Sequence, residues 1–155
     1  MAHAPDCTPL RNILFRRYLQ MLAPATVVFG GWAACRQAGL TPQMPDGTTA
    51  VVGPIAFIAA IALAVALPLL YRIRFVRSVE GQKNVESAPF MTFQLNLMTI
   101  ALIAPFAAAA GYIAGVANFH FAGAFLASLY AAYYYFPSKK RMTQEMRLFR
   151  VIADA

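Results

Sequence analysis

The hydrophobic positions of this chain fall into four long apolar stretches separated by shorter polar segments. The clearest stretch runs from Val51 to Leu70 and contains no charged side chain. As a helix rising about 1.5 Å per residue, it matches the hydrocarbon core of a bilayer, which is roughly 30 Å thick. The pattern predicts an all-α membrane protein with four transmembrane helices in two hairpins, over residues 18–34, 51–70, 90–116 and 121–136. The third stretch is longer than the hydrocarbon requires, so it either tilts or begins outside the bilayer.

Polar residues and prolines mark the ends of the predicted helices. Thr8 followed by Pro9 is typical of a helix start, because threonine caps free amides and proline tolerates the first helical position. Pro137 ends the fourth stretch, and Ser138 is placed to cap a following helix. Residues 138–152 are expected to form a basic amphipathic cytoplasmic tail that lies on the membrane surface. The apolar residues of this tail at helical spacing are Met142, Met146 and Phe149.

The composition supports a single transmembrane domain over residues 1–155. Of the 155 residues, 60% are hydrophobic and only 12% are charged, whereas charged residues make up about a quarter of an ordinary soluble domain. The formal charge of +7 would suggest nucleic acid as the partner of a soluble protein. In this chain the basic residues border the apolar stretches, so the expected partner is the anionic surface of the lipid bilayer and not nucleic acid.

The basic residues also predict an orientation. Of the 13 lysines and arginines, every one except Arg36 lies in the N-terminal segment, in the connection over residues 72–83, or in the C-terminal tail. Four spans place these three regions on one side, and the positive-inside rule makes that side the cytoplasm, with both termini. We expect an integral protein of the bacterial cytoplasmic (inner) membrane. The residues expected at the membrane surface are Arg11, Arg16, Arg17, Arg72, Arg74, Arg77, Lys139, Lys140 and Arg141.

An alternative for the first apolar stretch is a cleaved secretory signal, since arginines precede an apolar run that ends at Cys35. Trp32 occupies the position where a lipoprotein signal has a leucine-like residue, and Pro24 interrupts the run. A membrane span is therefore the preferred interpretation.

The spans show signs of an internal parallel repeat. The first and third each contain an Ala-Pro pair, at Pro24 and Pro105, followed six residues later by Gly30 and Gly111. The alternative is a chance match between alanine-rich helices. Small residues also recur at intervals of four, which lets helix backbones approach closely in lipid, either within one bundle or between subunits. The candidate packing residues are Ala107, Gly111, Gly115, Gly123, Ala127 and Ala131.

The spans contain no Asp, Glu, Lys, Arg or His between their predicted membrane ends. Proton relays and ion-coupled transporters usually carry such a group, so the sequence argues against both. We expect no metal and no cofactor, because the histidines and cysteines are few and scattered: His3, His120, Cys7 and Cys35. The tyrosines near the end of the fourth span favour interfacial anchoring over an aromatic-ligand site. They are Tyr130, Tyr133, Tyr134 and Tyr135.

A few uncharged polar residues remain as candidates for a pocket open to the cytoplasm. Thr92, Asn96 and Thr99 share one helix face by spacing, with Gln20 opposite. The complete candidate set is Gln20, Thr92, Gln94, Asn96 and Thr99. The simpler interpretation, which we prefer, places Gln94 and Asn96 in the headgroup region or in hydrogen bonds between helices.

These observations favour a non-catalytic membrane protein: a scaffold, an assembly factor or a small subunit of a larger complex, bound to other membrane subunits or to itself. The alternative is a small homo-oligomeric transporter or channel with a polar path near Gln20, Gln94 and Asn96.

Overall fold

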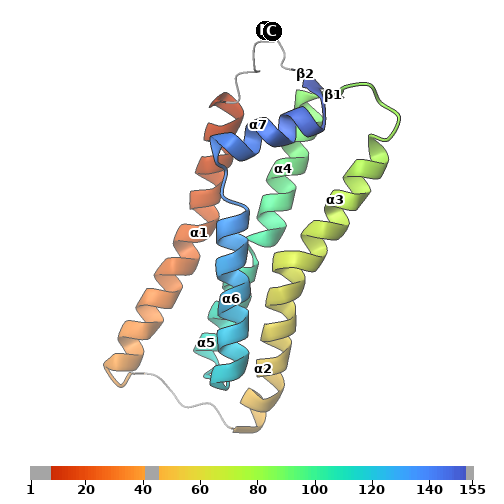
Figure 1. The fold of residues 1–155 in the computed structure, drawn as a ribbon. Helices are drawn as coiled ribbons and strands as arrows, with labels where there is room; N and C mark the ends of the chain where they lie inside the picture. The colour runs from red at the N-terminus through yellow and green to blue at the C-terminus, as the bar shows by residue number, and fades with distance from the viewer. Residues whose placement is uncertain (1–7, 41–45, 153–155) are drawn as a thin grey trace.

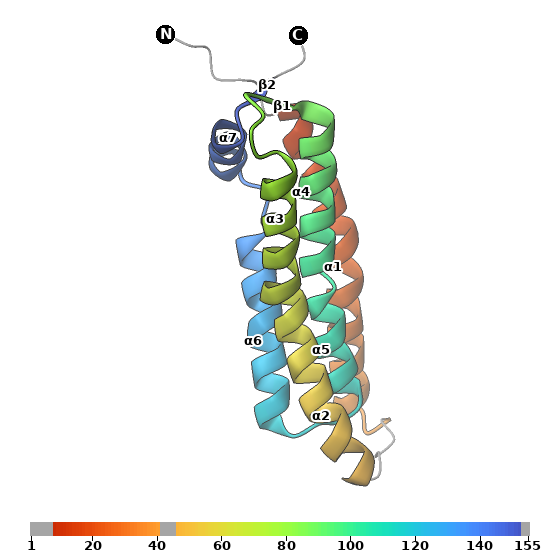
Figure 2. The same cartoon turned by 90° about the vertical axis from the view of Figure 1, so that its right-hand side faces the viewer.

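The computed structural model describes residues 8–40 and 46–152, and the described chain consists of helices, the turns that join them and one pair of two-residue strands. Its elements are α1 (Thr8–Gln37), α2 (Asp46–Ile61), the π-helical turn η1 (Ala62–Ala66), α3 (Leu67–Ser78), β1 (Val85–Glu86), α4 (Ser87–Ala101), α5 (Ala104–Ile113), α6 (Asn118–Tyr134), α7 (Lys139–Leu148) and β2 (Val151–Ile152). The helices α1, α2 with α3, α4 with α5, and α6 stand side by side (Figure 1). The short helix α7 crosses one end of this bundle (Figure 1), and it is seen end-on in Figure 2.

Three of these units are long and apolar enough to cross a membrane: Thr8–Gln37, Thr49–Ser78 and Ser87–Ile113. This confirms an all-helical chain of membrane-protein character. The first two have 30 residues each, which at about 1.5 Å per residue exceeds the roughly 30 Å hydrocarbon core. These two units therefore include the predicted spans 18–34 and 51–70 and extend beyond them, largely at the end where α7 crosses (Figure 1), whereas Ser87–Ile113 ends three residues before the predicted end of the third span.

Prolines explain the two irregular points in the long units. Pro68 has no N–H for the carbonyl of Ala64, and the π-helical turn over residues 62–66 comes immediately before it. The predicted third span is two helices, because the chain turns at Leu102 and Ile103 before Pro105 enters the first turn of α5. Pro24, by contrast, lies inside an uninterrupted α1.

The half of the bundle away from α7 is packed through small residues. Ala60, Ala108 and Ala124 are almost completely buried where α2, α5 and α6 meet. An ideal Cβ on Gly111 would lie 3.2 Å from the Cβ of Ala56, so α5 and α2 approach about as closely as two helices can.

The half near α7 has a different core, made of large side chains. The rings of Phe75 and Phe93 stack with centroids 4.0 Å apart, and Phe149 contacts both at 5.4 and 5.8 Å. Other large side chains buried in this core include Leu14, Phe90, Leu97, Leu102, Met98, Met142 and Met146. Phenylalanine and methionine side chains are also ordinary components of the buried cores of protein domains that are surrounded by water.

Helix α7 belongs to this core, which corrects the expectation that its apolar face lies on the membrane. Met142 and Met146 are each 2% exposed and Phe149 is 8% exposed, all packed against the bundle. The predicted cap is confirmed: the Ser138 hydroxyl accepts a hydrogen bond from the backbone N–H of Arg141 at 3.3 Å.

The strand pair was not anticipated from the sequence. β1 and β2 are parallel, with Val85 opposite Val151 and Glu86 opposite Ile152. The chain reaches this position through Arg150, whose φ of 50° lies in the left-handed region that favours glycine. The backbone N–H of Val85 donates to the carbonyl of Arg150 at 3.4 Å.

Helix α1 is held mainly at two places along its length. Near α7, Leu14 and Tyr18 are buried, and the Tyr18 hydroxyl donates to the carbonyl of Ala132 at 2.9 Å. Further along, the Phe29 ring packs against Tyr112 of α5 and Phe125 of α6, with centroids 6.0 and 5.8 Å away. Between and beyond these points much of α1 faces outward.

Candidate functional site

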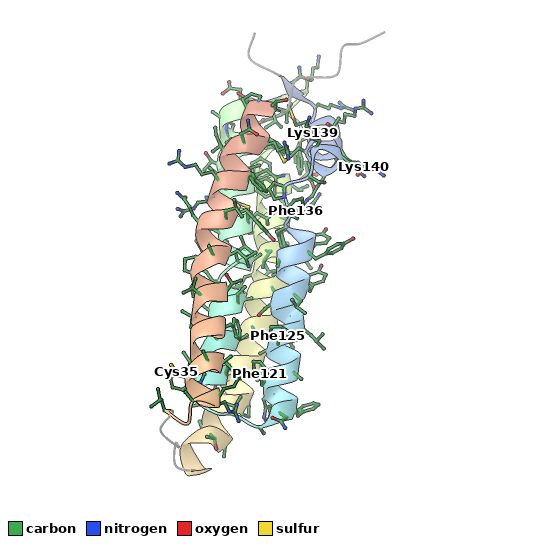
Figure 3. All side chains as sticks on the ribbon, turned by 90° about the vertical axis from the view of Figure 1, so that its left-hand side faces the viewer. Cys35, Phe121, Phe125, Phe136, Lys139 and Lys140 are labelled. Carbon is green, nitrogen blue, oxygen red and sulfur yellow. The ribbon has the colours of Figure 1, made fainter. Side chains whose placement is uncertain are left out.

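The basic residues gather at the end of the bundle that carries α7. Every lysine and arginine except Arg36 lies on the segments that form this end: the start of α1, the end of α3 and its connection to β1, and the segment from Lys139 to β2. Figure 3 shows Lys139 and Lys140 at this end and Cys35 at the opposite end. We call this region the basic end.

A groove at the basic end runs between α1 and α4 and has a volume of about 400 Å³. It is lined by Ile13, Arg16, Arg17, Gln20, Leu95, Asn96 and Thr99, and we call it the α1–α4 groove. The lining follows from helical periodicity, because positions separated by three, four and seven residues share one face of a helix. Three of the five candidate pocket residues, Gln20, Asn96 and Thr99, therefore lie together.

The groove is positively charged. Arg16 and Arg17 are both exposed, and the lining contains no acidic side chain. Within residues 8–40 and 46–152, neither arginine has an ion-pair or hydrogen-bond partner. The amide nitrogen of Asn96 donates to the hydroxyl of Tyr71 at 3.0 Å, which fixes the orientation of that side chain at the groove wall.

The other two candidate pocket residues lie elsewhere. Gln94 is 5% exposed and faces a separate cavity of about 10 Å³, close to the lower limit for one water molecule. Its Nε2 is buried and has no hydrogen-bond partner in the part of the chain that the structure describes. Thr92 is exposed, and its hydroxyl donates to the carbonyl of Ala88 in its own helix at 3.1 Å.

A larger cavity, of about 850 Å³, lies beneath α7. Its lining combines aromatic and aliphatic side chains with a few charged ones: Tyr18, Arg72, Leu129, Ala132, Tyr133, Tyr134, Phe136, Ser138, Arg141, Gln144, Glu145 and Leu148. The Arg72 guanidinium forms a two-point contact with the Glu145 carboxylate, at 3.0 and 3.1 Å. This pair connects α3 to α7.

The second arginine of this cavity is also engaged by the protein. Arg141 donates to the backbone carbonyl of Tyr134, and its guanidinium lies over the rings of Tyr134 and Tyr135, at 5.0 and 5.2 Å from their centroids. Burial lowers the pKa of Arg141. Arg72 and Arg141, both expected at the membrane surface, therefore make protein contacts, and the lining of the larger cavity keeps one positive charge, that of Arg141, without an acidic partner of its own.

The remaining expected surface residues are peripheral. Arg74, Arg77, Lys139 and Lys140 are exposed, and Arg11 is half-buried with its guanidinium 6.0 Å from the Phe15 ring centroid. At the basic end, Arg72 and Arg141 thus contact other protein groups, whereas the exposed lysines and arginines face outward.

The predicted packing residues have varied positions. Gly111 contacts Ala56, an ideal Cβ on Gly123 would overlap the ring of Phe57, and Ala131 is fully buried. Ala107 and Ala127 are half-buried against the same interior. Gly115 instead serves the turn that ends α5, where its φ of +66° suits glycine.

Sequence reasoning missed the two arginines as walls of the groove, although Arg16 and Arg17 precede Gln20 by four and three residues and share its helix face. Among the described residues, no group of three His, Cys, Asp or Glu side chains is placed to hold a metal. His120 packs closely against Gly53, and its buried Nδ1 has no hydrogen-bond partner within the described residues.

Comparison with protein-family models, with curated proteins and with solved structures gives no match.

Proposed function

We propose that this chain is a non-catalytic integral membrane protein that acts as a scaffold, an assembly factor or a small subunit of a larger complex. It would span the bacterial cytoplasmic membrane four times with both termini and α7 in the cytoplasm. At about 1.5 Å per residue, the 17 residues of α6 reach roughly 26 Å, nearly the hydrocarbon thickness. The basic end then faces the cytoplasm, as the positive-inside rule requires.

The observation that carries this proposal is the uncovered face of α1. Only 11% of the most apolar stretch of α1 is buried, against 56% for Ser87–Ile113. Thr26, Gly30 and Ala34, spaced by four residues, are all exposed. An ideal Cβ on Gly30 would meet no described atom within 4 Å outside its own helix.

Rows of small residues let two membrane helices approach closely, where lipid provides no hydrophobic drive. The corresponding positions on α2 and α5 already pack against each other: Ala56 meets Gly111, and Ala60 and Ala108 are fully buried. The row on α1 is open, so it fits a helix of another membrane subunit or of a second copy.

The transporter alternative has weaker support. Gln20 and Asn96 line the α1–α4 groove, whereas Gln94 faces a different cavity, so the three residues do not line one path. The half of the bundle away from α7 is filled by Ala60, Ala108 and Ala124. A conducting path would have to form between copies.

The arrangement as two hairpins and the parallel repeat remain predictions. Helix α1 packs mainly against α4 and α5, and α2 against α5 and α6. Pro24 is exposed within α1, whereas Pro105 is buried at the start of α5. A repeat would therefore have diverged at its most recognisable residue.

The test is purification of the full chain in a mild detergent or in native nanodiscs. We expect a stoichiometric partner, or a defined homo-oligomer, that is lost in Gly30→Leu. The matched control is Ala122→Leu, which adds three carbons where Gly30→Leu adds four, at an exposed position of α6. A monodisperse, partner-free wild-type particle that carries out transport in liposomes would overturn the proposal.

A further inference from the structure

The α1–α4 groove has the charge and layering of a lipid site. We propose that it binds the phosphate of one anionic phospholipid from the cytoplasmic leaflet. The inference depends on the proposed membrane orientation, which places the basic end at the cytoplasmic surface, and it does not depend on a protein partner.

The first argument is charge. Arg16 and Arg17 give the groove two positive charges that no acidic lining residue offsets, and neither has a protein partner within the described residues. Guanidinium groups bind phosphate through paired N–H donors, and such charge-assisted hydrogen bonds are stronger than neutral ones. The two arginines of the larger cavity differ, because Arg72 is paired with Glu145 and Arg141 is bound to Tyr134.

The second argument is depth. Helices α1 and α4 both run away from the basic end (Figure 1). Gln20 therefore lies one helical turn, about 6 Å, deeper than Arg16, and Thr99 lies about 4.5 Å deeper than Asn96. Among the polar lining residues, the cations thus lie at the outer level and the neutral hydrogen-bonding groups lie below them, while the apolar Ile13 lies about 4.5 Å further out than Arg16.

This order matches that of a phospholipid entering the bilayer: phosphate, then ester groups, then acyl chains. The Gln20 amide and the Thr99 hydroxyl can donate to ester carbonyls. Below them the outer surface becomes apolar, with Val27 and Ile103 exposed by 72% and 40%. An acyl chain leaving the groove would follow these side chains.

The third argument is size. The groove volume of about 400 Å³ lies in the range of small-ligand sites, about 300–1,000 Å³. It admits a phosphate with its glycerol but not a whole lipid, so the acyl chains must lie on the outer surface of the bundle.

The experiment is native mass spectrometry of the full chain, titrated with phosphatidylglycerol or, as the neutral lipid, phosphatidylcholine. We expect wild-type protein to retain one phosphatidylglycerol and to bind it at least about tenfold more tightly than phosphatidylcholine. The double variant Arg16→Gln/Arg17→Gln should lose that preference. The matched control Arg74→Gln/Arg77→Gln removes two exposed charges from the same end and should retain it.

Two further arms keep the result decisive. The neutral variant Gln20→Leu/Thr99→Val should weaken phosphatidylglycerol binding several-fold with no change in charge, which guards against a general loss of folding or of surface attraction. Glycerol phosphate is added as a soluble competitor. Displacement of the lipid by millimolar glycerol phosphate would show that the groove binds free phosphate esters, and it would overturn the lipid proposal.

Equal losses in the groove variant and the charge control would overturn it as well, because they would indicate diffuse attraction to the basic end. Co-purification of a partner is measured separately on the same variants. Selective lipid binding by a partner-free protein would leave this proposal standing while overturning the proposed function.

Discussion

The contact between Gly111 and Ala56 allows a quantitative test of the bundle interior. In Gly111→Leu, the new Cβ would lie 3.2 Å from the Cβ of Ala56 and 3.6 Å from a methyl of Val116. Alanine has no rotatable side chain that can move aside, so the three further carbons of leucine must push α5 and α2 apart. Overpacking of this kind costs about 1–3 kcal/mol, while replacing a helical glycine returns at most about 1 kcal/mol. We expect a net loss of about 1–2 kcal/mol.

The assay is equilibrium unfolding in mixed micelles with increasing SDS, followed by circular dichroism. Gly111→Ala needs a shift of only a few tenths of an ångström and should be close to neutral. Gly30→Leu is the matched control, since no described atom outside its own helix lies within 4 Å of that site, and its monomer should be at least as stable as wild type. The packing argument is refuted if Gly111→Leu is as stable as wild type, or if Gly30→Leu is destabilised equally.

Three predictions concern the attachment of α7. Phe149→Ala removes an aromatic side chain that is only 8% exposed and should cost about 3–5 kcal/mol, seen as faster protease cleavage in α7; unchanged cleavage would contradict it. Glu145→Gln breaks the partly exposed pair with Arg72 and should cost about 1 kcal/mol. Salt should lower the unfolding free energy of wild type but not of this variant. Ser138→Ala removes the cap on the Arg141 N–H and should cost about 0.5–2 kcal/mol in the same SDS titration, with Ser138→Asp restoring stability.

The positions of the long helices could be predicted because hydropathy is a local property. The apolar run from Val51 to Leu70 lies within the observed unit Thr49–Ser78, and the predicted span over residues 18–34 lies within α1. Whether such a run is placed in lipid or in water depends on the summed transfer free energies of its own residues. The break before Pro105 follows from the same local chemistry, although an uninterrupted α1 around Pro24 shows that proline alone does not decide it.

The surroundings of α7 and of the polar residues could not be predicted in the same way. The apolar face of Met142 and Met146 has the same pattern whether it meets lipid or protein, and only the three-dimensional arrangement brings it against the aromatic core. Gln94 and Asn96 are two residues apart, about 200° around the helix, so they face opposite directions. Which of these directions is buried depends on the placement of α1, which no local pattern specifies.

The parallel pair of β1 and β2 brings the end of the described chain back beside the start of α4. Phe149 and Val151 complete a core whose other members, such as Phe90 and Phe93, are translated much earlier. During synthesis these rings are therefore exposed to water or to chaperones until the segment with Phe149 and Val151 emerges from the ribosome. The core of the basic end is completed only then, and a nascent chain interrupted before residue 149 would present an aromatic surface that quality-control machinery can recognise. Insertion of the apolar helices and maturation of the protein would then be separate events in time.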